Sequence, residues 1–292
     1  MGLSIAGGAY AQAALETIGK PVNKAMGFQP AGTDVARDVH WLDNFMLYII
    51  TGIVIFVVVL LLICLIRFNS RANPKPARFT HNSALEIAWT LIPIVILIAI
   101  IPPSLTLLFK QEIIPQADVT IKATGNQWYW NYEYVDSDFN FDSYMIGQPA
   151  TLPDDAADQA YKRSPAVLKL LKEKGYAADE FLLATDTAMV IPVNKTIVVQ
   201  VTGSDVIHSW AVPAFGVKQD AVPGRLAELW FKADKVGIYF GQCSQLCGKD
   251  HAYMPITVKV VSQDDYEAWL KEAFTQYSDA GTPRNVQIAS AN

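Results

Sequence analysis

A run of 22 residues without a charged side chain, Phe45 to Ile66, constrains this chain more than any other feature. The hydrocarbon core of a bilayer is about 30 Å thick, and a helix needs about 20 apolar residues to cross it. A buried helix of a soluble protein is rarely apolar on every side over such a length. The run therefore predicts a transmembrane helix.

A second apolar run, from Ile87 to Phe109, follows after a short connecting segment. It contains three prolines, which membrane helices tolerate when neighbouring groups satisfy the freed carbonyl oxygens. The connecting segment 67–84 has no acidic residue, and its basic residues are Arg67, Arg71, Lys75 and Arg78. Because short cytoplasmic loops carry an excess of Lys and Arg, we expect a hairpin over residues 42–109 with its loop in the cytoplasm.

The two ends of the chain are placed by this topology. Residues 1–41 are predicted to be a leader, extended over 12–40. The leader and everything after the hairpin are expected to lie outside, in the periplasm or its equivalent. The leader contains an A-x-A sequence at Ala9 to Ala11, so it could be the end of a signal peptide cleaved before Gln12. A plain flexible terminus is the alternative. Residues 278–292 are predicted to be a tail.

The second apolar run begins next to an acidic residue, Glu86. Ser83 and Glu86 form an S-x-x-E pattern, which predicts a capping box with Ser83 as the N-cap. Ionisable residues near membrane depth are also functional candidates, and on that hypothesis Glu86 admits protons from the cytoplasm. The two interpretations are compatible.

From Asp118 onward, the spacing of apolar residues becomes that of short strands. The segments rich in β-branched and aromatic residues, separated by Gly, Pro, Asn and Asp, are VTIKAT, QWYWNYEY, AMVIPV, TIVVQVTG, RLAELWF, GIYFGQC and ITVKVV. This pattern predicts an all-β sandwich or barrel over residues 110–277.

Two stretches of this outer region differ from the strand pattern. Residues 150–180 are charged and rich in Ala and Lys, and are predicted to be a surface insertion with one short helix near Pro165 to Lys174. Tyr266, Trp269 and Phe274 have helical spacing, so Gln263 to Tyr277 should form a terminal helix packed on the sheet.

Soft metal ligands are concentrated in the segment GQCSQLCGKDHAYM, where Cys243, Cys247, His251 and Met254 stand as C-x3-C-x3-H-x2-M. Thiolates, thioethers and imidazoles suit copper, and a mononuclear blue-copper site needs only one Cys with two His and a weak Met. The second thiolate could bridge two ions, which indicates a dinuclear copper centre completed by His208. A zinc site made by Cys243, Cys247, His251 and His208, or a disulfide in an exported domain, are the alternatives.

Three segments carry a resemblance to a known family: QWYWNYEY, DVIHSWAVPAFGVKQDAVPGR and YFGQCSQLCGKDHAYMPI. Together with the hairpin, they make residues 18–270 resemble subunit II of haem–copper cytochrome c oxidases, and most of all the alphaproteobacterial aa3-type enzymes. The resemblance implies a cupredoxin-like sandwich that holds a dinuclear copper centre. It implies that Cys243 and Cys247 bridge the two ions, that His208 and His251 bind one ion each, and that Met254 and the carbonyl of Gln245 are weak ligands.

The same resemblance assigns functions to residues outside the copper motif. Trp128 matches the residue through which electrons enter from cytochrome c, although alone it would be taken for an aromatic anchor at the sheet surface. Glu86 matches the acid at the mouth of a proton channel that leads into subunit I. Acidic positions that meet the lysine ring of cytochrome c match Glu133, Asp142, Asp186 and Asp205. Such acids are otherwise ordinary solvated residues, though clustered charge can also steer a basic partner.

Gln245 departs from the family, which usually has Glu at this position. The copper contact uses the backbone and should survive the change. The family's Glu carboxylate also binds magnesium or manganese at the interface with subunit I, and an amide is a weaker ligand for a hard cation. The sequence therefore predicts intact copper sites and a weakened or altered magnesium or manganese site.

By this resemblance the chain is expected to be the electron-entry subunit of an oxidase that reduces oxygen and pumps protons. Its expected partners are subunits I and III, cytochrome c and membrane lipid. Nucleic acid is not expected, because the chain has no basic patch. Two alternatives remain open: a membrane-anchored copper carrier with a labile mononuclear site, and a quinol oxidase subunit, which would lack the copper ligands.

Overall fold

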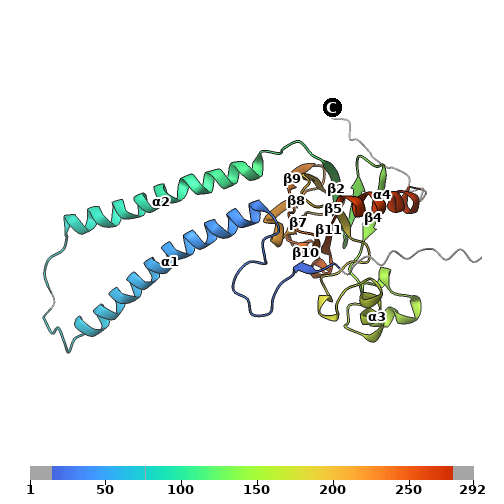
Figure 1. Ribbon diagram of the computed structural model, residues 1–292. Coiled ribbons are helices and arrows are strands. Elements are labelled where there is room, and N and C mark those ends of the chain that lie inside the picture. Colours follow the sequence, from blue (N-terminus) through green and yellow to red (C-terminus); the bar gives the residue numbers. More distant parts are fainter. Residues whose placement is uncertain (1–14, 76, 279–292) are drawn as a thin grey trace, which may run out of the picture. The chain divides into compact units, whose positions relative to one another are not determined.

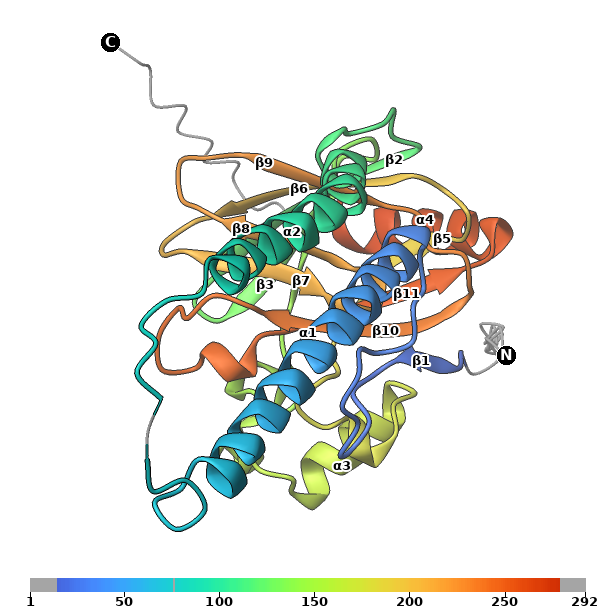
Figure 2. The same cartoon turned by 90° about the vertical axis from the view of Figure 1, so that its left-hand side faces the viewer.

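The computed structural model describes residues 15–75 and 77–278, and it contains two compact units (Figures 1 and 2). One unit is the helical hairpin, Arg37–Ile113. The other combines the described residues up to Ala36 with those from Ile114 onward. The predicted cleavage site before Gln12 and the predicted tail, from residue 279 on, lie outside the described residues.

Two long helices form the hairpin, α1 over Asp34–Arg67 and α2 over Ser83–Glu112, and they run in opposite directions (Figure 1). Both are long and apolar enough to cross a membrane. Pro93, Pro102 and Pro103 lie inside α2 without ending it, as predicted. An ion pair between Lys110 Nζ and Asp38 Oδ2, at 2.5 Å, joins the end of α2 to the beginning of α1.

The beginnings of both helices differ from the sequence predictions. Helix α1 begins at Asp34, inside the segment predicted to be extended, because the Oγ1 atom of Thr33 accepts a hydrogen bond from the amide of Ala36 at 3.0 Å. The predicted capping box at Ser83 is wrong. The N-cap of α2 is Asn82, whose side chain accepts from the amide of Leu85 at 3.2 Å. Asn is as good an N-cap as Ser, so the local pattern did not distinguish the two positions.

The outer unit is a sandwich of two β-sheets. The first sheet has the strand order β5-β11-β10-β7-β8, and β1 pairs with β10 outside this path. Its strands are β5 (Met189–Pro192), β11 (Pro255–Val261), β10 (Gly237–Cys243), β7 (His208–Val212), β8 (Val217–Ala221) and β1 (Thr17–Gly19). Most pairs are antiparallel, but β1 with β10 and β5 with β11 are parallel.

The second sheet has the order β4-β3-β2-β6-β9. Its strands are β4 (Phe139–Ser143), β3 (Tyr129–Tyr134), β2 (Val119–Asn126), β6 (Ile197–Gly203) and β9 (Ala227–Phe231). All seven predicted strands are present, and the predicted sandwich is confirmed. Strands β1, β4, β7 and β8, which are three to five residues long, were not predicted.

The core of the sandwich follows from alternation along the strands. In β3, Trp130, Tyr132 and Tyr134 are buried, whereas the residues between them are partly exposed. Helix α4 (Gln263–Tyr277) covers part of this sheet, with the Trp269 ring centroid 5.1 Å from that of Tyr134. The predicted terminal helix and its packing are therefore confirmed.

The insertion has a core of its own, in addition to its exposed surface. Helix α3 (Pro165–Glu173) forms where a helix was predicted, and the hydroxyl of Ser164 caps it by accepting from the amide of Val167. Its buried side chains pack with Ile238 and Phe240 of β10. Because β10 ends at Cys243, the insertion packs on the strand that leads to the predicted metal ligands.

Candidate metal centre

The predicted ligands lie on two paired strands and on the loop that follows one of them. Cys243 is the last residue of β10 and His208 is the first of β7, and the antiparallel pairing of these strands sets Cys243 opposite Trp210. Cys247 lies in the following loop. His251 begins the 3₁₀-helix η5 (His251–Tyr253), and Met254 follows it directly. Residues far apart in sequence therefore meet at one end of the first sheet.

The ligand atoms converge around the sulfur of Cys247. It lies 3.9 Å from the sulfur of Cys243, 3.5 Å from Nδ1 of His251 and 3.5 Å from Sδ of Met254. One ring nitrogen of His208 and the two cysteine sulfurs all lie within 4.8 Å of one another. The carbonyl oxygen of Gln245 is 3.3 Å from the Cys243 sulfur. The structure thus brings together every predicted copper ligand.

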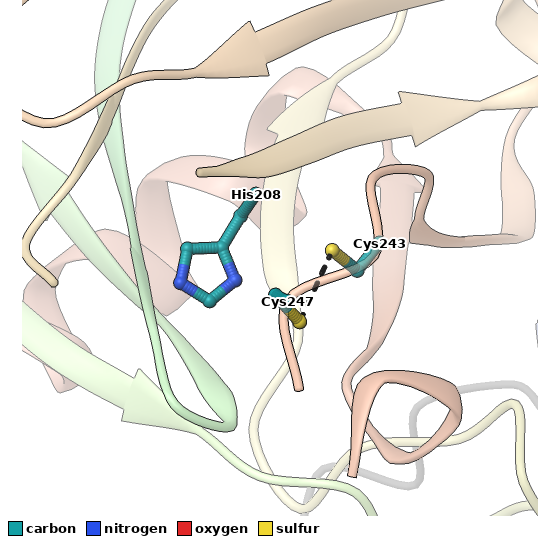
Figure 3. Close-up of side chains that lie close together, drawn as sticks. All are labelled: His208, Cys243 and Cys247. Carbon is teal, nitrogen blue, oxygen red and sulfur yellow. Dashed lines mark hydrogen bonds between the residues drawn. The ribbon is translucent and has the colours of Figure 1, made fainter. Parts of the chain in front are cut away.

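His208 is already oriented for a metal ion. Its Nε2 atom is 2.8 Å from Oδ1 of Asp205, and Figure 3 shows its other side turned toward the two sulfurs. Its Nδ1 atom is buried and has no hydrogen-bond partner among the residues that the structure describes. A buried polar atom without a partner is rare, and a carboxylate on the far nitrogen is the usual support of a metal-binding imidazole.

The site is closed and rich in sulfur. Cys243, Cys247 and Met254 are at most 5% exposed, and both cysteines are free thiols. Burial raises the pKa of the Cys247 thiol to about 12, and the nearby Cys243 adds to the rise. Burial also opposes ionisation of Cys243, but its His208 neighbour and the backbone near Gln245 lower its pKa. A metal ion would replace the Cys247 proton, since the thiolate is the ligand form. Two thiolates, imidazoles and a thioether are a donor set that fits copper.

Trp128 lies against the ligand loop, between β2 and β3. Its Nε1 atom donates to the carbonyl oxygen of Cys247 at 3.3 Å, and Nε2 of Gln127 donates to the same oxygen at 2.9 Å. Gly248 makes this approach possible, because a Cβ there would stand 2.9 Å from the indole, and its φ of +129° is unfavourable for other residues. The Nζ atom of Lys249 lies 5.5 Å from the ring centroid.

The predicted docking acids fall into two groups. Glu133 and Asp142 lie on the neighbouring strands β3 and β4, where Glu133 pairs with Lys122 at 3.3 Å and Asp142 accepts from Asn131 at 2.8 Å. Asp186 instead accepts from the amides of Tyr144 and Thr187, and burial raises its pKa. Asp205 accepts from the amide of Gln127 at 2.8 Å in addition to its bond with His208.

The two remaining predicted residues belong to different units of the structure. Glu86 is in the first turn of α2 in the hairpin unit, where its carbonyl accepts from the hydroxyl of Thr90 at 2.9 Å. The side chain of Gln245 is exposed, whereas its carbonyl points to the Cys243 sulfur.

Sequence reasoning missed the residues that support the ligands. These include Gly125, where a Cβ would stand 2.8 Å from the His208 ring, and the amides of Gln127 and Gln148. The only sequence signal for Gly125 and Gln127 was their position, because Gln127 begins QWYW and Gly125 lies two residues before it. Their partners lie far away in sequence.

Comparison with known proteins identifies the family. The family model described as cytochrome C oxidase subunit II, periplasmic domain, matches residues 119–261, and the one described as its transmembrane domain matches residues 21–107. The chain is 62% identical over 271 residues to cytochrome c oxidase subunit 2 of Cereibacter sphaeroides, covering 93% of this chain and 88% of that protein. The chain belongs to the cytochrome c oxidase subunit II family.

Other relatives of this subunit II agree. This subunit II is 46% identical over 252 residues to a probable cytochrome c oxidase subunit 2 of Rickettsia bellii, and the match covers 86% of this chain and 85% of the relative. The crystal structure of the periplasmic domain of subunit II of cytochrome oxidase from Bradyrhizobium japonicum is 48% identical, with a TM-score of 0.44, and covers 56% of this chain and 99% of that one. The alphaproteobacterial resemblance and the fold class, a two-helix membrane hairpin with a cupredoxin-like sandwich, are confirmed. The chain is a component of an oxidoreductase complex.

Proposed function

We propose that this subunit II is the electron-entry subunit of its oxidase. It receives electrons from reduced cytochrome c and delivers them to a haem in subunit I, where oxygen is reduced and protons are pumped. Subunits I and III, cytochrome c and membrane lipid are its partners. Its sandwich and both termini face the periplasm, and the loop 67–84 faces the cytoplasm of a bacterial inner membrane. The basic residues of that loop support this orientation.

The observation that carries the proposal is the convergence of two thiols, imidazole nitrogen and a thioether in one buried site. Cys243 and Cys247 would bridge two copper ions, His208 and His251 would bind one ion each, and Met254 and the carbonyl of Gln245 would be weak ligands. Bound copper would supply a one-electron redox centre in which the bridging thiolates share one electron between two ions. The paired strands and the Asp205 bond hold the ligands in place, which limits rearrangement.

Trp128 is the proposed point of entry. Its indole bonds to the carbonyl of a bridging cysteine, so the ring and the centre are joined through one hydrogen bond. Glu133 and Asp142 present carboxylates on adjacent strands of the same sheet, which suits docking of a basic partner. Asp186 and Asp205 are retained as docking candidates, although both also bond to backbone amides. Glu86 is proposed to admit protons from the cytoplasmic side.

The dinuclear centre is tested by electron paramagnetic resonance of the copper-loaded oxidase. We expect a seven-line hyperfine pattern, because one unpaired electron is shared by two copper nuclei. Cys247→Ser should abolish this pattern, since one bridging thiolate is lost, whereas Cys64→Ser in α1 should leave it intact. An ordinary four-line spectrum from the unaltered protein would instead favour a mononuclear copper carrier.

A further inference from the structure

The side chain of Gln148 joins two segments that the proposed electron entry depends on. Gln148 follows β4 and is 5% exposed. Its Nε2 atom donates to the carbonyl oxygen of Trp128 at 2.9 Å and to that of Tyr253 at 2.5 Å. A carboxamide nitrogen carries two protons, so both are used. Tyr253 directly precedes the ligand Met254, and the amide therefore bridges the tryptophan and the ligand segment.

A second connection also links Trp128 to the segment that carries the proposed ligands. The indole of Trp128 and the amide of Gln127 both donate to the carbonyl of Cys247. The ring of Trp128 is thus tied to one ligand, and its backbone is tied through Gln148 to the residue before another. Loss of either connection removes one of the two restraints on the position of the tryptophan relative to the ligands.

Residues at the beginning of the insertion contact Tyr253 and the segment Gly147–Gln148. The amide of Tyr161 donates to the carbonyl of Gly147 at 2.7 Å, and the Tyr161 ring lies 4.7 Å from that of Tyr253. Tyr161 has a φ of +59°, which is unfavourable for a residue other than glycine. The hydroxyl of Thr151 also donates to the carbonyl of Gln148, at 2.9 Å. Backbone strain that the surrounding structure maintains is concentrated at functional sites.

We propose that Gln148 is a positioning residue for electron entry, and that it sets the spacing between Trp128 and the ligand segment that ends in Met254. The inference rests on the proposed function. The two carbonyl groups to which Gln148 donates belong to Trp128 and Tyr253, neither of which is a proposed copper ligand, so Gln148 acts through these two residues. Removing its donors should therefore alter transfer within the docked complex without altering docking itself.

The test uses the complete oxidase carrying Gln148→Leu or Gln148→Glu, which lack the two amide protons. Gln263→Leu is the control, because Gln263 also donates through its side-chain amide, to Oε1 of Glu267 at 2.9 Å, but both residues belong to helix α4 and not to the ligand segment. Two quantities are measured: the rate of electron entry from bound cytochrome c together with its KM, and the rate at which copper is lost to a chelator.

For both Gln148 variants we expect electron entry to slow by roughly tenfold, as positioning errors do, with an unchanged KM. Copper content at isolation should be unchanged, but its release to the chelator should be severalfold faster, since the segment before Met254 is less restrained. The Gln263→Leu control should match the unaltered oxidase in both measurements. Unchanged entry and release in an assembled Gln148 variant, or equal changes in the control, would overturn the proposal.

Trp128→Ala, measured in parallel, separates this inference from the function on which it rests. If Trp128→Ala slows entry while the Gln148 variants do not, only the positioning role fails. If Trp128→Ala has no effect on entry, the entry site itself is wrong, and the release of copper still reports on the restraint at Tyr253.

Discussion

At the scale of single residues, Asp205 is a candidate for docking cytochrome c and also contacts a proposed metal ligand. It was predicted from the family resemblance as a docking acid, and the structure adds bonds to the Nε2 atom of His208 and to two backbone amides. Burial favours a higher pKa for Asp205, but the His208 contact and these amides hold the pKa below its usual value. The carboxylate therefore stays ionised at neutral pH and orients a ligand of the proposed centre.

A second prediction at the scale of single residues concerns Gln245 and the affinity for a hard cation. Gln245→Glu should increase the affinity of the oxidase for Mg²⁺ or Mn²⁺, because a carboxylate is a better ligand than an amide for a hard cation. The copper spectrum should not change, since the group near Cys243 is the backbone carbonyl of residue 245. Metal analysis after dialysis, together with the copper spectrum, measures both effects.

Gln245→Asn, which keeps an amide, is the control for that substitution. It should leave the magnesium or manganese content as in the unaltered protein. Tightly held, stoichiometric magnesium in the unaltered oxidase would show that Gln245 does not weaken the site.

At the scale of elements, the insertion and β1 are parts of the scaffold for the metal centre. Strand β1 pairs with β10, and the hydroxyl of Thr17 donates to the buried carboxylate of Glu180 at 2.6 Å. The insertion's core includes Ile238 and Phe240 of the same β10. Both elements therefore stabilise the strand that ends at Cys243.

A cavity in the insertion tests this contribution. Leu171→Ala removes a fully buried side chain of α3 and should lower the free energy of unfolding by about 2–5 kcal/mol. Leu226→Ala, at a side chain that is 55% exposed, should change it by less than about 0.5 kcal/mol. Denaturant unfolding followed by tryptophan fluorescence measures the difference. Equal stability of the two variants would mean that the insertion is only a surface appendage.

At the scale of the whole molecule, the proposed function assigns the docking of cytochrome c and the entry of electrons to different residues. The acids Glu133 and Asp142 lie on the neighbouring strands β3 and β4, whereas Trp128 lies at the ligand loop before β3 begins. Charged groups on an exposed surface act mainly on the association rate and are screened by salt. The tryptophan acts only after the complex has formed.

Trp128→Ala should therefore slow electron entry from cytochrome c by at least roughly tenfold while copper content stays the same. Asp142→Asn should instead raise the KM for cytochrome c and weaken its dependence on ionic strength, because one surface charge is lost. Stopped-flow reduction at two salt concentrations distinguishes the two effects. Turnover of Trp128→Ala at the unaltered rate would remove Trp128 from the route.

Local patterns were sufficient for much of this protein. The uncharged run at Phe45 to Ile66, the seven strand segments and the helix at Gln263 to Tyr277 are all present as predicted, because burial and periodicity are properties of neighbouring residues. The C-x3-C-x3-H-x2-M spacing likewise predicted a set of side chains whose sulfur and nitrogen atoms lie close together in the structure. Local patterns were weaker at element ends, where Asn82 and Thr33 replaced the expected starts.

Only the tertiary structure decided which distant residues support the centre. The contacts of Asp205 with Gln127, of Gln148 with Trp128 and Tyr253, and of the insertion with β10 join segments from different strands and loops. Polar side chains such as these have no periodic signal, since a single Gln or Asp is equally compatible with a solvated surface. Their partners are set by strand order and register, and these depend on how the whole sandwich packs.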